Sequence, residues 1–475
     1  MLSKRKNVSR LQLLWPLAIG SAIASLTLLG SARADSDNIT KTGQVNVPTV
    51  ESACGTGFTE TFFSFDISWI DPRLNTYLLA DRSHGGASKG DALMIDINNP
   101  LAGPVYITPP ASDPFAGIRC DANADFGGTN GAGRNELGGP NGVFTVKNGN
   151  GVGHPEAWLG DGPADFTVGQ NNLASDYATD PCNSSVRVFD LTTRKQIDHI
   201  NVGGCFRTDE GAYDPKDQIA VFANPSELPI PSPDAKHPLN DSPYVTFIST
   251  KPGHKILAQI NFNGNNGTFL ANGGIEQAVY SPDTGLFYIA IPGNSTAPKN
   301  GVVAVIDPRN PKDIHVVENF AMTDCSPNGA ALGPDFELLL GCGAGPEQVI
   351  DIRTGDQVTG SPIVGTTGGC DEVAFNAGDN HFAGACTDAN SPPTDNLDIS
   401  DAKPPIALDQ QINTHATGAH SVAADPDTVT YWMPMYGGLC GTNPTPPNQA
   451  CIAIFGGGSN NGDDISMNAP KGKGK

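Results

Sequence analysis

Apolar residues in this chain come in short runs that are paired across a tight polar turn. This pattern occurs seven times between Asp66 and Asp425, first as DISWIDPRLNTYLLAD. The seven units start at Asp66, Asn141, Asp209, Glu276, Asn328, Asp371 and His420. The starts lie roughly 45 to 75 residues apart, near the length of a four-stranded propeller blade with some long loops. Such a unit cannot bury its faces alone, so the pattern predicts an all-β, seven-bladed β-propeller of four-stranded antiparallel blades.

The first strand of each unit is expected to be the innermost of its blade. The seventh unit runs short of chain, because only Cys451–Phe455 and a glycine-rich tail follow it. We predict that Gly43–Val50 supplies the missing outermost strand and closes the ring without an exposed sheet edge. The propeller is therefore assigned to residues 35–455. Residues 456–475 lack apolar periodicity and are predicted to be a disordered tail.

Residues 1–34 are predicted to be a signal peptide. A basic start with Lys4, Arg5 and Lys6 precedes the apolar stretch Leu11–Leu29, and Ala32-Arg33-Ala34 matches a signal-peptidase site. An uncleaved membrane anchor is the alternative, because the apolar stretch is nearly long enough to span a bilayer. Cleavage would leave an exported protein without a membrane span, located in the periplasm or secreted.

Composition narrows the choice of partners. The chain of 475 residues has 50 acidic and 28 basic residues and a formal net charge of −22. Such a body repels phosphate backbones, so no nucleic acid is expected as a partner, whereas metal cations are attracted. The 56 glycines and 39 prolines suit many short strands joined by tight turns. We expect a monomer.

The ten cysteines of an exported chain are best explained as disulfides. Two pairs flank successive strand pairs at almost the same spacing, and an antiparallel hairpin brings its start beside its end. The predicted pairs are Cys325–Cys342, Cys370–Cys386, Cys182–Cys205 and Cys440–Cys451, with Cys54–Cys120 paired by elimination.

The long loops are predicted to gather on one rim of the ring, together with all ten cysteines. We call this the elaborated rim, and its loops are Pro109–Pro140, Asp161–Ser184, Asn224–Pro243, Thr387–Asn396 and Pro434–Ala450. The opposite rim, here the short-turn rim, has mostly brief turns such as Asp71-Pro72-Arg73. Because binding usually follows elaborated loops, a small molecule or a protein is expected to bind at the elaborated rim.

Two resemblances carry further expectations. The Asp-Pro turn followed by Tyr77–Asp81, YLLAD, resembles the YVTN-type β-propellers of exported bacterial proteins, and this resemblance covers nearly all of the mature chain. The starts at Pro140-Asn141-Gly142 and Pro327-Asn328-Gly329 are similar to those of gluconolactonase and regucalcin-like propellers. That resemblance implies a calcium ion held by such an Asn in the central channel. The Glu-Gly-Pro start of that family's first ligand strand is absent here.

Aligning the units places their first residues together at the channel mouth. Six of these seven residues offer side-chain oxygens, and four of the six are carboxylates, which should bind a cation or have raised pKa values. The predicted metal ligands are Asp66, Asn141, Asp209, Glu276, Asn328 and Asp371. Ca²⁺ suits such an oxygen cage, and another divalent metal is the alternative because His420 adds an imidazole. The same residues are equally suited to cap strands and bind channel water.

Strand alternation predicts the direction of the side chains that follow the channel residues. Because adjacent strand residues face opposite ways, we expect Glu210 and Glu372 to pack between blades rather than to face the channel. Arg82 at the mouth is a candidate for binding a substrate carboxylate, and an ion pair with Asp81 or with a neighbouring loop is the alternative.

Two classes of function follow. The first is an exported propeller that binds a small ligand, a cation or a partner at its disulfide-stapled rim, with no assigned activity. The alternative is a metal-dependent hydrolase or lyase, lactonase-like, with its site at the channel mouth. In that alternative His420 would act as general base and Arg82 would bind the substrate.

Overall fold

The computed structural model describes most of the chain between residues 38 and 457. The described residues are 38–48, 50–51, 61–84, 90–117, 138–147, 153–163, 183–204, 206–225, 242–293, 297–366, 368–388, 394–416, 418, 420–441 and 450–457. The described residues form one compact unit, which begins at Asn38. The predicted signal peptide, 1–34, lies outside the described residues. None of the described helices is long and apolar enough to cross a membrane.

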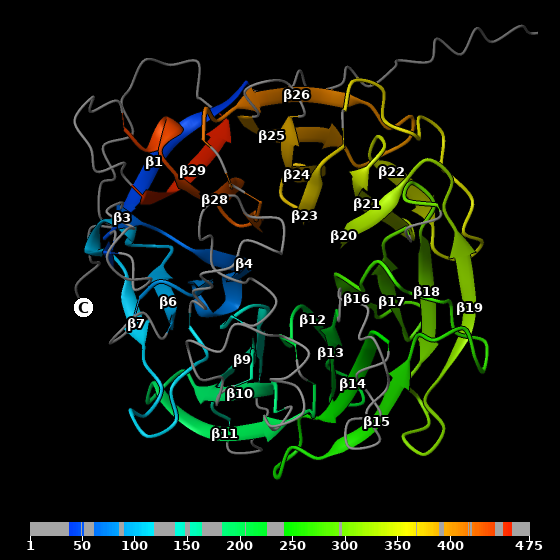
Figure 1. Ribbon diagram of the computed structural model, residues 1–475. Coiled ribbons are helices and arrows are strands. Elements are labelled where there is room, and N and C mark those ends of the chain that lie inside the picture. Colours follow the sequence, from blue (N-terminus) through cyan, green and yellow to red (C-terminus); the bar gives the residue numbers. More distant parts are fainter. Residues whose placement is uncertain are drawn as a thin grey trace, which may run out of the picture. The chain divides into compact units, whose positions relative to one another are not determined.

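Seven antiparallel sheets surround a central axis, so the predicted seven-bladed propeller is confirmed (Figure 1). Blade 1 consists of β4 (Phe65–Asp71), β5 (Thr76–Asp81), β6 (Asp91–Asp96) and β7 (Val105–Ile107). Blade 2 consists of β8 (Val143–Val146), β9 (Glu156–Asp161), β10 (Ser185–Asp190) and β11 (Lys195–Asn201). Blade 3 consists of β12 (Gly211–Asp214), β13 (Ile219–Asn224), β14 (Tyr244–Ser249) and β15 (Ile256–Asn261). In blades 1 to 6 the first strand in the chain is the one nearest the axis (Figure 1).

The next three blades follow in chain order. Blade 4 consists of β16 (Ala278–Ser281), β17 (Leu286–Ile291), β18 (Val302–Asp307) and β19 (His315–Ala321). Blade 5 consists of β20 (Ser326–Leu332), β21 (Glu337–Ala344) and β22 (Gln348–Asp351). Blade 6 consists of β23 (Cys370–Asn376), β24 (His381–Asp388), β25 (Thr394–Asp401) and β26 (Leu408–Asn413).

Blade 7 joins the two ends of the propeller as predicted, although its closing strand covers Ile39–Val47 rather than the predicted Gly43–Val50. Its strands β27 (Ala423–Asp425), β28 (Thr430–Tyr436) and β29 (Ala450–Gly457) are completed by β1 (Ile39–Val47). Strand β1 pairs antiparallel with β29 along its length, from Ile39 opposite Gly457 to Val47 opposite Ala450. The ring is thus closed by backbone hydrogen bonds that tie residue 39 to residue 457. A small separate sheet pairs β2 (Val50–Glu51) with β3 (Thr61–Phe62).

Blade 5 departs from the predicted four strands, because its described part has three. In place of a fourth strand, residues 356–363 run beside β22 with isolated backbone bonds, from Val358 N–H to Val349 O (3.0 Å) and from Ile363 N–H to Glu347 O (2.9 Å). Gly360, with φ of +97°, and Pro362, which has no N–H, interrupt a regular ladder.

The core lies between the blades, and this explains the continuous apolar runs of the middle strands. On β13, Val221 packs with Phe247 and Phe287 on one side. The adjacent Phe222 faces the other way and packs against Phe144, with ring centroids 5.1 Å apart. Both faces of a blade are buried against its neighbours, so its central strands carry no polar face.

The short turns are built by local capping. In blade 1 the Asp71 carboxylate accepts a hydrogen bond from Arg73 N–H (3.0 Å) and starts the one-turn 3-10 helix η1 (Pro72–Leu74). Two further short helices, η2 (Pro100–Ala102) and η4 (Gly438–Cys440), lie in other connections. Such turns keep the connections on the short-turn rim close to the ends of the strands.

Three predicted disulfides are present: Cys325–Cys342, Cys370–Cys386 and Cys440–Cys451. The pairs Cys182–Cys205 and Cys54–Cys120 lie outside the described residues and stay predictions.

Candidate functional site

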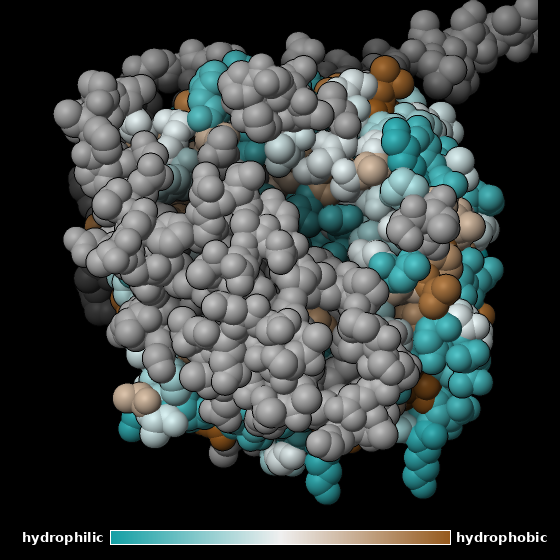
Figure 2. Space-filling model, in the orientation of Figure 1, coloured by the Kyte–Doolittle hydropathy of each residue, from teal (hydrophilic) through white to brown (hydrophobic). Residues whose placement is uncertain are grey.

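The seven predicted channel residues occupy equivalent positions at the starts of the inner strands. Asp66 is the second residue of β4, and Asn141, Asp209 and Glu276 each precede an inner strand by two residues. Asn328 and Asp371 lie near the starts of β20 and β23, and His420 precedes β27. In the space-filling view, the face shown is hollowed near the centre of the ring and the residues visible there are hydrophilic (Figure 2).

The two Pro-Asn-Gly starts allow neighbouring blades to approach at this level. A Cβ added at Gly142 would lie 2.1 Å from the backbone oxygen of Asp209, and one at Gly329 would lie 2.4 Å from that of Asp371. Only glycine fits at either position, so each motif lets the acidic residue of the next blade come close.

Arg82 links the first two blades. Its Nη2 donates to Asp66 Oδ2, its Nε donates to Asn141 Oδ1 (2.9 Å), and its Nη1 donates to Phe65 O (3.3 Å). Asn141 Nδ2 in turn donates to Thr208 O (3.0 Å) on the way into blade 3. Arg82 is 4% exposed. In this arrangement its guanidinium compensates the Asp66 carboxylate, which is a different partner from the predicted Asp81.

His420 is the second cation beside Asp66. Its Nε2 lies 3.4 Å from Asp66 Oδ1, its Nδ1 lies 2.8 Å from Gly418 O, and its ring stacks on Phe65. Burial opposes the charged imidazole, but the hydrogen bond to Asp66 and the charges of Asp371 and Asp66 raise the pKa of His420 to about 9. Burial would also raise the pKa of Asp66, yet Arg82, His420 and Arg207 hold it below its ordinary value. At neutral pH His420 is therefore an imidazolium, which can donate a proton.

The remaining predicted residues also find partners in the ring. Arg207 Nε donates to Asp209 Oδ2 (2.6 Å), and both side chains are buried. Asn328 Nδ2 donates to Asp371 Oδ1 (3.3 Å), which joins blade 5 to blade 6.

Glu210 and Glu372 were expected between the blades, and this expectation is wrong. Their carboxyl groups lie close enough to shift each other's pKa, although they belong to blades 3 and 6 on opposite sides of the ring. Strand alternation does not apply to either residue. Glu210 precedes β12, which begins at Gly211, and Glu372 lies where the register of β23 shifts between Cys370 and Val373.

Two buried carboxyl groups that lie this close together favour the protonated form, and their surroundings raise the pKa of both. Burial, followed by the carboxyls of Glu372 and Asp209, raises the pKa of Glu210 well above its ordinary value. Burial, together with Asp371, Asp66 and Asp209, raises the pKa of Glu372 to about 8. Both groups therefore favour the protonated form more strongly than an ordinary glutamate does.

These side chains form what we call the axial carboxyl layer. Its members are Asp66, Asp209, Glu210, Glu276, Asp371 and Glu372. Arg82, Arg207 and His420 offset part of their charge from within the protein.

The layer also contains a geometry that fits a cation. Ligand oxygens of Asp209, Glu210 and Glu276 all lie within 4.8 Å of one another, and all three residues are buried. Oxygens bound to Ca²⁺ lie roughly 2.3 to 2.6 Å from the ion, so three such oxygens can share one. A second group, Glu347 with Cys370 and Cys386, is excluded as a metal site because its two sulfurs form a disulfide.

Beside the layer, the axis opens into a cavity of about 720 Å³, here called the axial cavity. All seven inner strands contribute to its wall, mainly with small apolar residues such as Ala278, Ala330 and Ala374. The cavity continues to the exposed Arg73, Lys147 and Pro215 in the short turns. It therefore opens toward the short-turn rim, on the side away from the predicted binding loops, which lie mostly outside the described residues.

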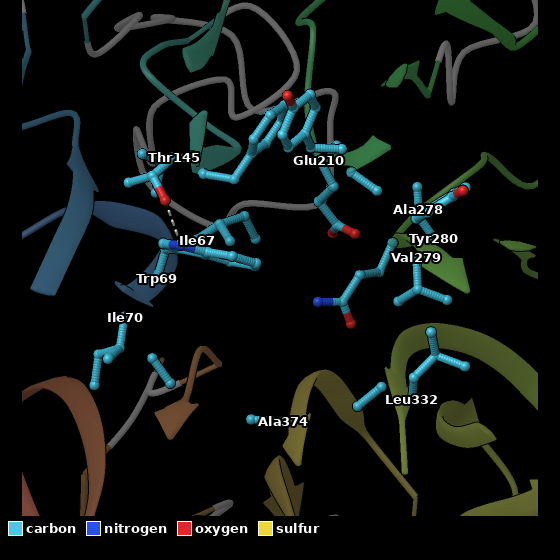
Figure 3. A pocket seen from close by; sticks show the side chains of 18 of the residues that line it. Ile67, Trp69, Ile70, Thr145, Glu210, Ala278, Val279, Tyr280, Leu332 and Ala374 are labelled. Carbon is cyan, nitrogen blue, oxygen red and sulfur yellow. Dashed lines mark hydrogen bonds between the residues drawn. The ribbon is translucent and has the colours of Figure 1, made fainter. Parts of the chain in front are cut away.

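Two of the side chains in the close view lie on facing sides of the axial cavity (Figure 3). The indole of Trp69 extends into it from β4, and the carboxyl of Glu210 points into it from the facing wall. Gln277 also lines the cavity, and its Oε1 accepts a hydrogen bond from Ala330 N–H.

Sequence reasoning missed Glu210, Glu372, Gln277 and Arg207 as members of this site. Three of them directly follow a predicted channel residue, at the second position of a unit. That shared position was the available signal, because an acidic or amide residue repeated there in blades 3, 4 and 6 is unusual for a strand buried on both faces.

Comparisons with known proteins add little to the geometry. No protein-family model matches the chain, and no curated protein matches it either. A chain in the crystal structure of the mitotic checkpoint complex is 10% identical, with a TM-score of 0.47 over 94% of this chain and 98% of that chain. A chain of Kuenenia stuttgartiensis hydrazine synthase is 14% identical, with a TM-score of 0.40 over 64% of this chain and 77% of that chain. Neither similarity says what this chain binds.

Proposed function

We propose that this protein is an exported binding propeller that holds a small organic molecule in its axial cavity. The observation that supports this proposal is the cavity itself, with about 720 Å³ of space at the centre of the ring. Ligand sites are commonly concave spaces of roughly 300 to 1,000 Å³, mostly apolar, with a few convergent polar groups. The alanine-rich wall, the Glu210 carboxyl and the Gln277 amide match that description.

The proposed export rests on the predicted signal peptide and on the disulfides. Three disulfides among the described residues fit an oxidising compartment, either the periplasm or the extracellular medium. The Asp71-Pro72 turn and the strand that follows it are in keeping with the YVTN-type propellers that the units resemble.

A metal-dependent hydrolase is the second candidate, and the cluster of Asp209, Glu210 and Glu276 favours it. These residues would hold a divalent cation such as Ca²⁺, which polarises a substrate carbonyl when bound. His420, as an imidazolium beside Asp66, would then suit a general acid better than the general base expected for it. Elemental analysis of the purified protein distinguishes this candidate, since it requires stoichiometric metal that a chelator removes together with activity.

The binding proposal is tested by filling the cavity. Ala374 lines the wall, so Ala374→Phe should occupy part of the space (Figure 3). Ala102→Phe, on the exposed η2, is the matched control. We expect a fragment screen by ligand-observed NMR to find neutral or charged compounds that bind the wild type and Ala102→Phe but not Ala374→Phe. If no compound binds in a way that Ala374→Phe abolishes, the proposal fails.

A further inference from the structure

The floor and the mouth of the axial cavity differ in chemistry. Glu210 is 4% exposed, and its Oε2 has no hydrogen-bond partner among the described residues. The carboxyl nevertheless points into open space (Figure 3). A buried oxygen acceptor that faces a cavity is expected to meet a donor there, from water or from a ligand. The floor therefore offers one acceptor of potential negative charge.

Across the cavity from Glu210 stands a positioned aromatic ring. Trp69 is 40% exposed, and its Nε1 donates to Thr145 Oγ1 (3.3 Å), as Figure 3 shows. Thr145 Oγ1 donates in turn to Asp71 Oδ2 (2.6 Å). This chain of hydrogen bonds orients the indole, whose face is the strongest cation–π acceptor among the side chains.

We propose that the ligand of the axial cavity is an organic ammonium ion. Its nitrogen would donate to Glu210 at the floor, its apolar body would contact the alanine wall, and an aromatic or alkyl end would pack on Trp69. This inference rests on the proposed binding function and specifies the chemical class of the ligand.

The charges around the cavity favour a cation over an anion. Behind Glu210 lie the carboxyls of Asp209 and Glu276, which would repel a ligand carboxylate. At the mouth, Arg73 is neutralised by its bidentate contact with Asp71, at 2.9 Å and 2.7 Å. Lys147 is exposed to solvent, which screens its charge. The net charge of −22 adds long-range attraction for cations.

The size and lining of the cavity favour an organic cation over a bare metal ion. A metal ion fills only a small part of about 720 Å³, and neither the apolar wall nor Trp69 contributes to its binding. An ammonium ion with a hydrocarbon body uses all three features.

The test compares four probes by isothermal titration calorimetry at neutral pH. 2-Phenylethylammonium is the cation, 2-phenylethanol its neutral analogue, phenylacetate its anionic analogue, and CaCl₂ the metal. We expect the ammonium probe to bind roughly tenfold or more tightly than the alcohol, because a charge-assisted hydrogen bond and a cation–π contact are added. Phenylacetate should bind most weakly of the organic probes.

Variants test which side chains produce the preference for the ammonium probe. Glu210→Gln should remove the preference of ammonium over alcohol, while Glu347→Gln, which alters another fully buried carboxyl away from the cavity, should keep it. Trp69→Ala, at an exposed position that tolerates truncation, should weaken the ammonium probe roughly threefold to tenfold. Ala374→Phe should abolish binding of every organic probe.

The outcomes separate the two proposals. Equal affinity for the ammonium and the alcohol, tighter binding of phenylacetate, or an ammonium preference that survives Glu210→Gln would overturn the inference and leave the binding function intact. Absence of binding by all three organic probes also overturns the inference, and the wider fragment screen then decides the binding function. Calcium binding alone would favour the hydrolase candidate.

Discussion

The carboxyl pair at the axis has a measurable consequence for stability. Between the ordinary pKa of 4.5 and about 8, the folded protein holds a proton on Glu372 that the unfolded chain has released. The folded state binds more protons in this window, so the free energy of unfolding falls as the pH rises. The loss amounts to about 1.4 kcal/mol per pH unit, up to about 5 kcal/mol across the window.

Glu372→Gln should remove this dependence. The amide has nearly the same shape, cannot ionise, and can still donate a hydrogen bond to Glu210. At about pH 5 the variant should be as stable as the wild type or slightly less stable, and at about pH 9 it should be more stable by several kcal/mol. Urea unfolding followed by tryptophan fluorescence measures the difference, because Trp158 and Trp432 are buried in the folded state.

Glu318→Gln is the control, since Glu318 lies exposed on β19. Its unfolding free energy should follow that of the wild type at every pH. A difference in unfolding free energy between Glu372→Gln and wild type that stays constant from about pH 5 to about pH 9 would refute the raised pKa of Glu372. A carboxyl with an ordinary pKa does not change its protonation in that range.

Three further predictions concern the ring. Arg82→Met leaves the buried Asp66 carboxylate without its guanidinium and should lower the unfolding free energy in urea by roughly 3 to 5 kcal/mol, and a loss under about 1 kcal/mol would contradict this. Deleting residues 38–47 exposes the edge of β29, so size-exclusion chromatography should show aggregation, and a stable monomer with unchanged melting would count against the closure. Replacing Cys440 and Cys451 by serine opens a loop with a sequence separation of 11 and should cost roughly 3 kcal/mol in urea. An unchanged unfolding midpoint would be the contrary result.

The fold was predictable because each blade requires the same sequence pattern of apolar strands joined by short turns. Strands such as β13 are buried on both faces, so they appear as apolar runs that end at capped turns like that of Asp71. Counting these runs leaves blade 7 one strand short, and β1 fills that place. Blade 5 could not be read in the same way, because its outer segment is held by single bonds rather than by a ladder.

The candidate site was predictable only at the first position of each unit, because equivalent positions of aligned units lie at one level of the ring. Aligned unit starts correctly gathered Asp66, His420 and their equivalents, since equivalent positions of a ring share a level. The next positions were missed because alternation was assumed to begin at the unit start. Glu210 stands before its strand and Glu372 at a bulge, so both turn to the axis. Asp66, the partner of Arg82, lies on the paired strand β4 beside a register shift between Phe65 and Ser68, which the sequence pattern does not show.

The axial carboxyl layer separates the two rims of the propeller. Arg82 pairs with Asp66 and Arg207 with Asp209, all four are buried at the level of the strand starts, and Arg82 also bonds to Asn141 of the next blade. A molecule in the axial cavity would have to break these ion pairs to pass through, at a cost of several kcal/mol for each buried charge left unpaired. Ligand access is therefore expected from the short-turn rim, where brief turns leave the mouth open.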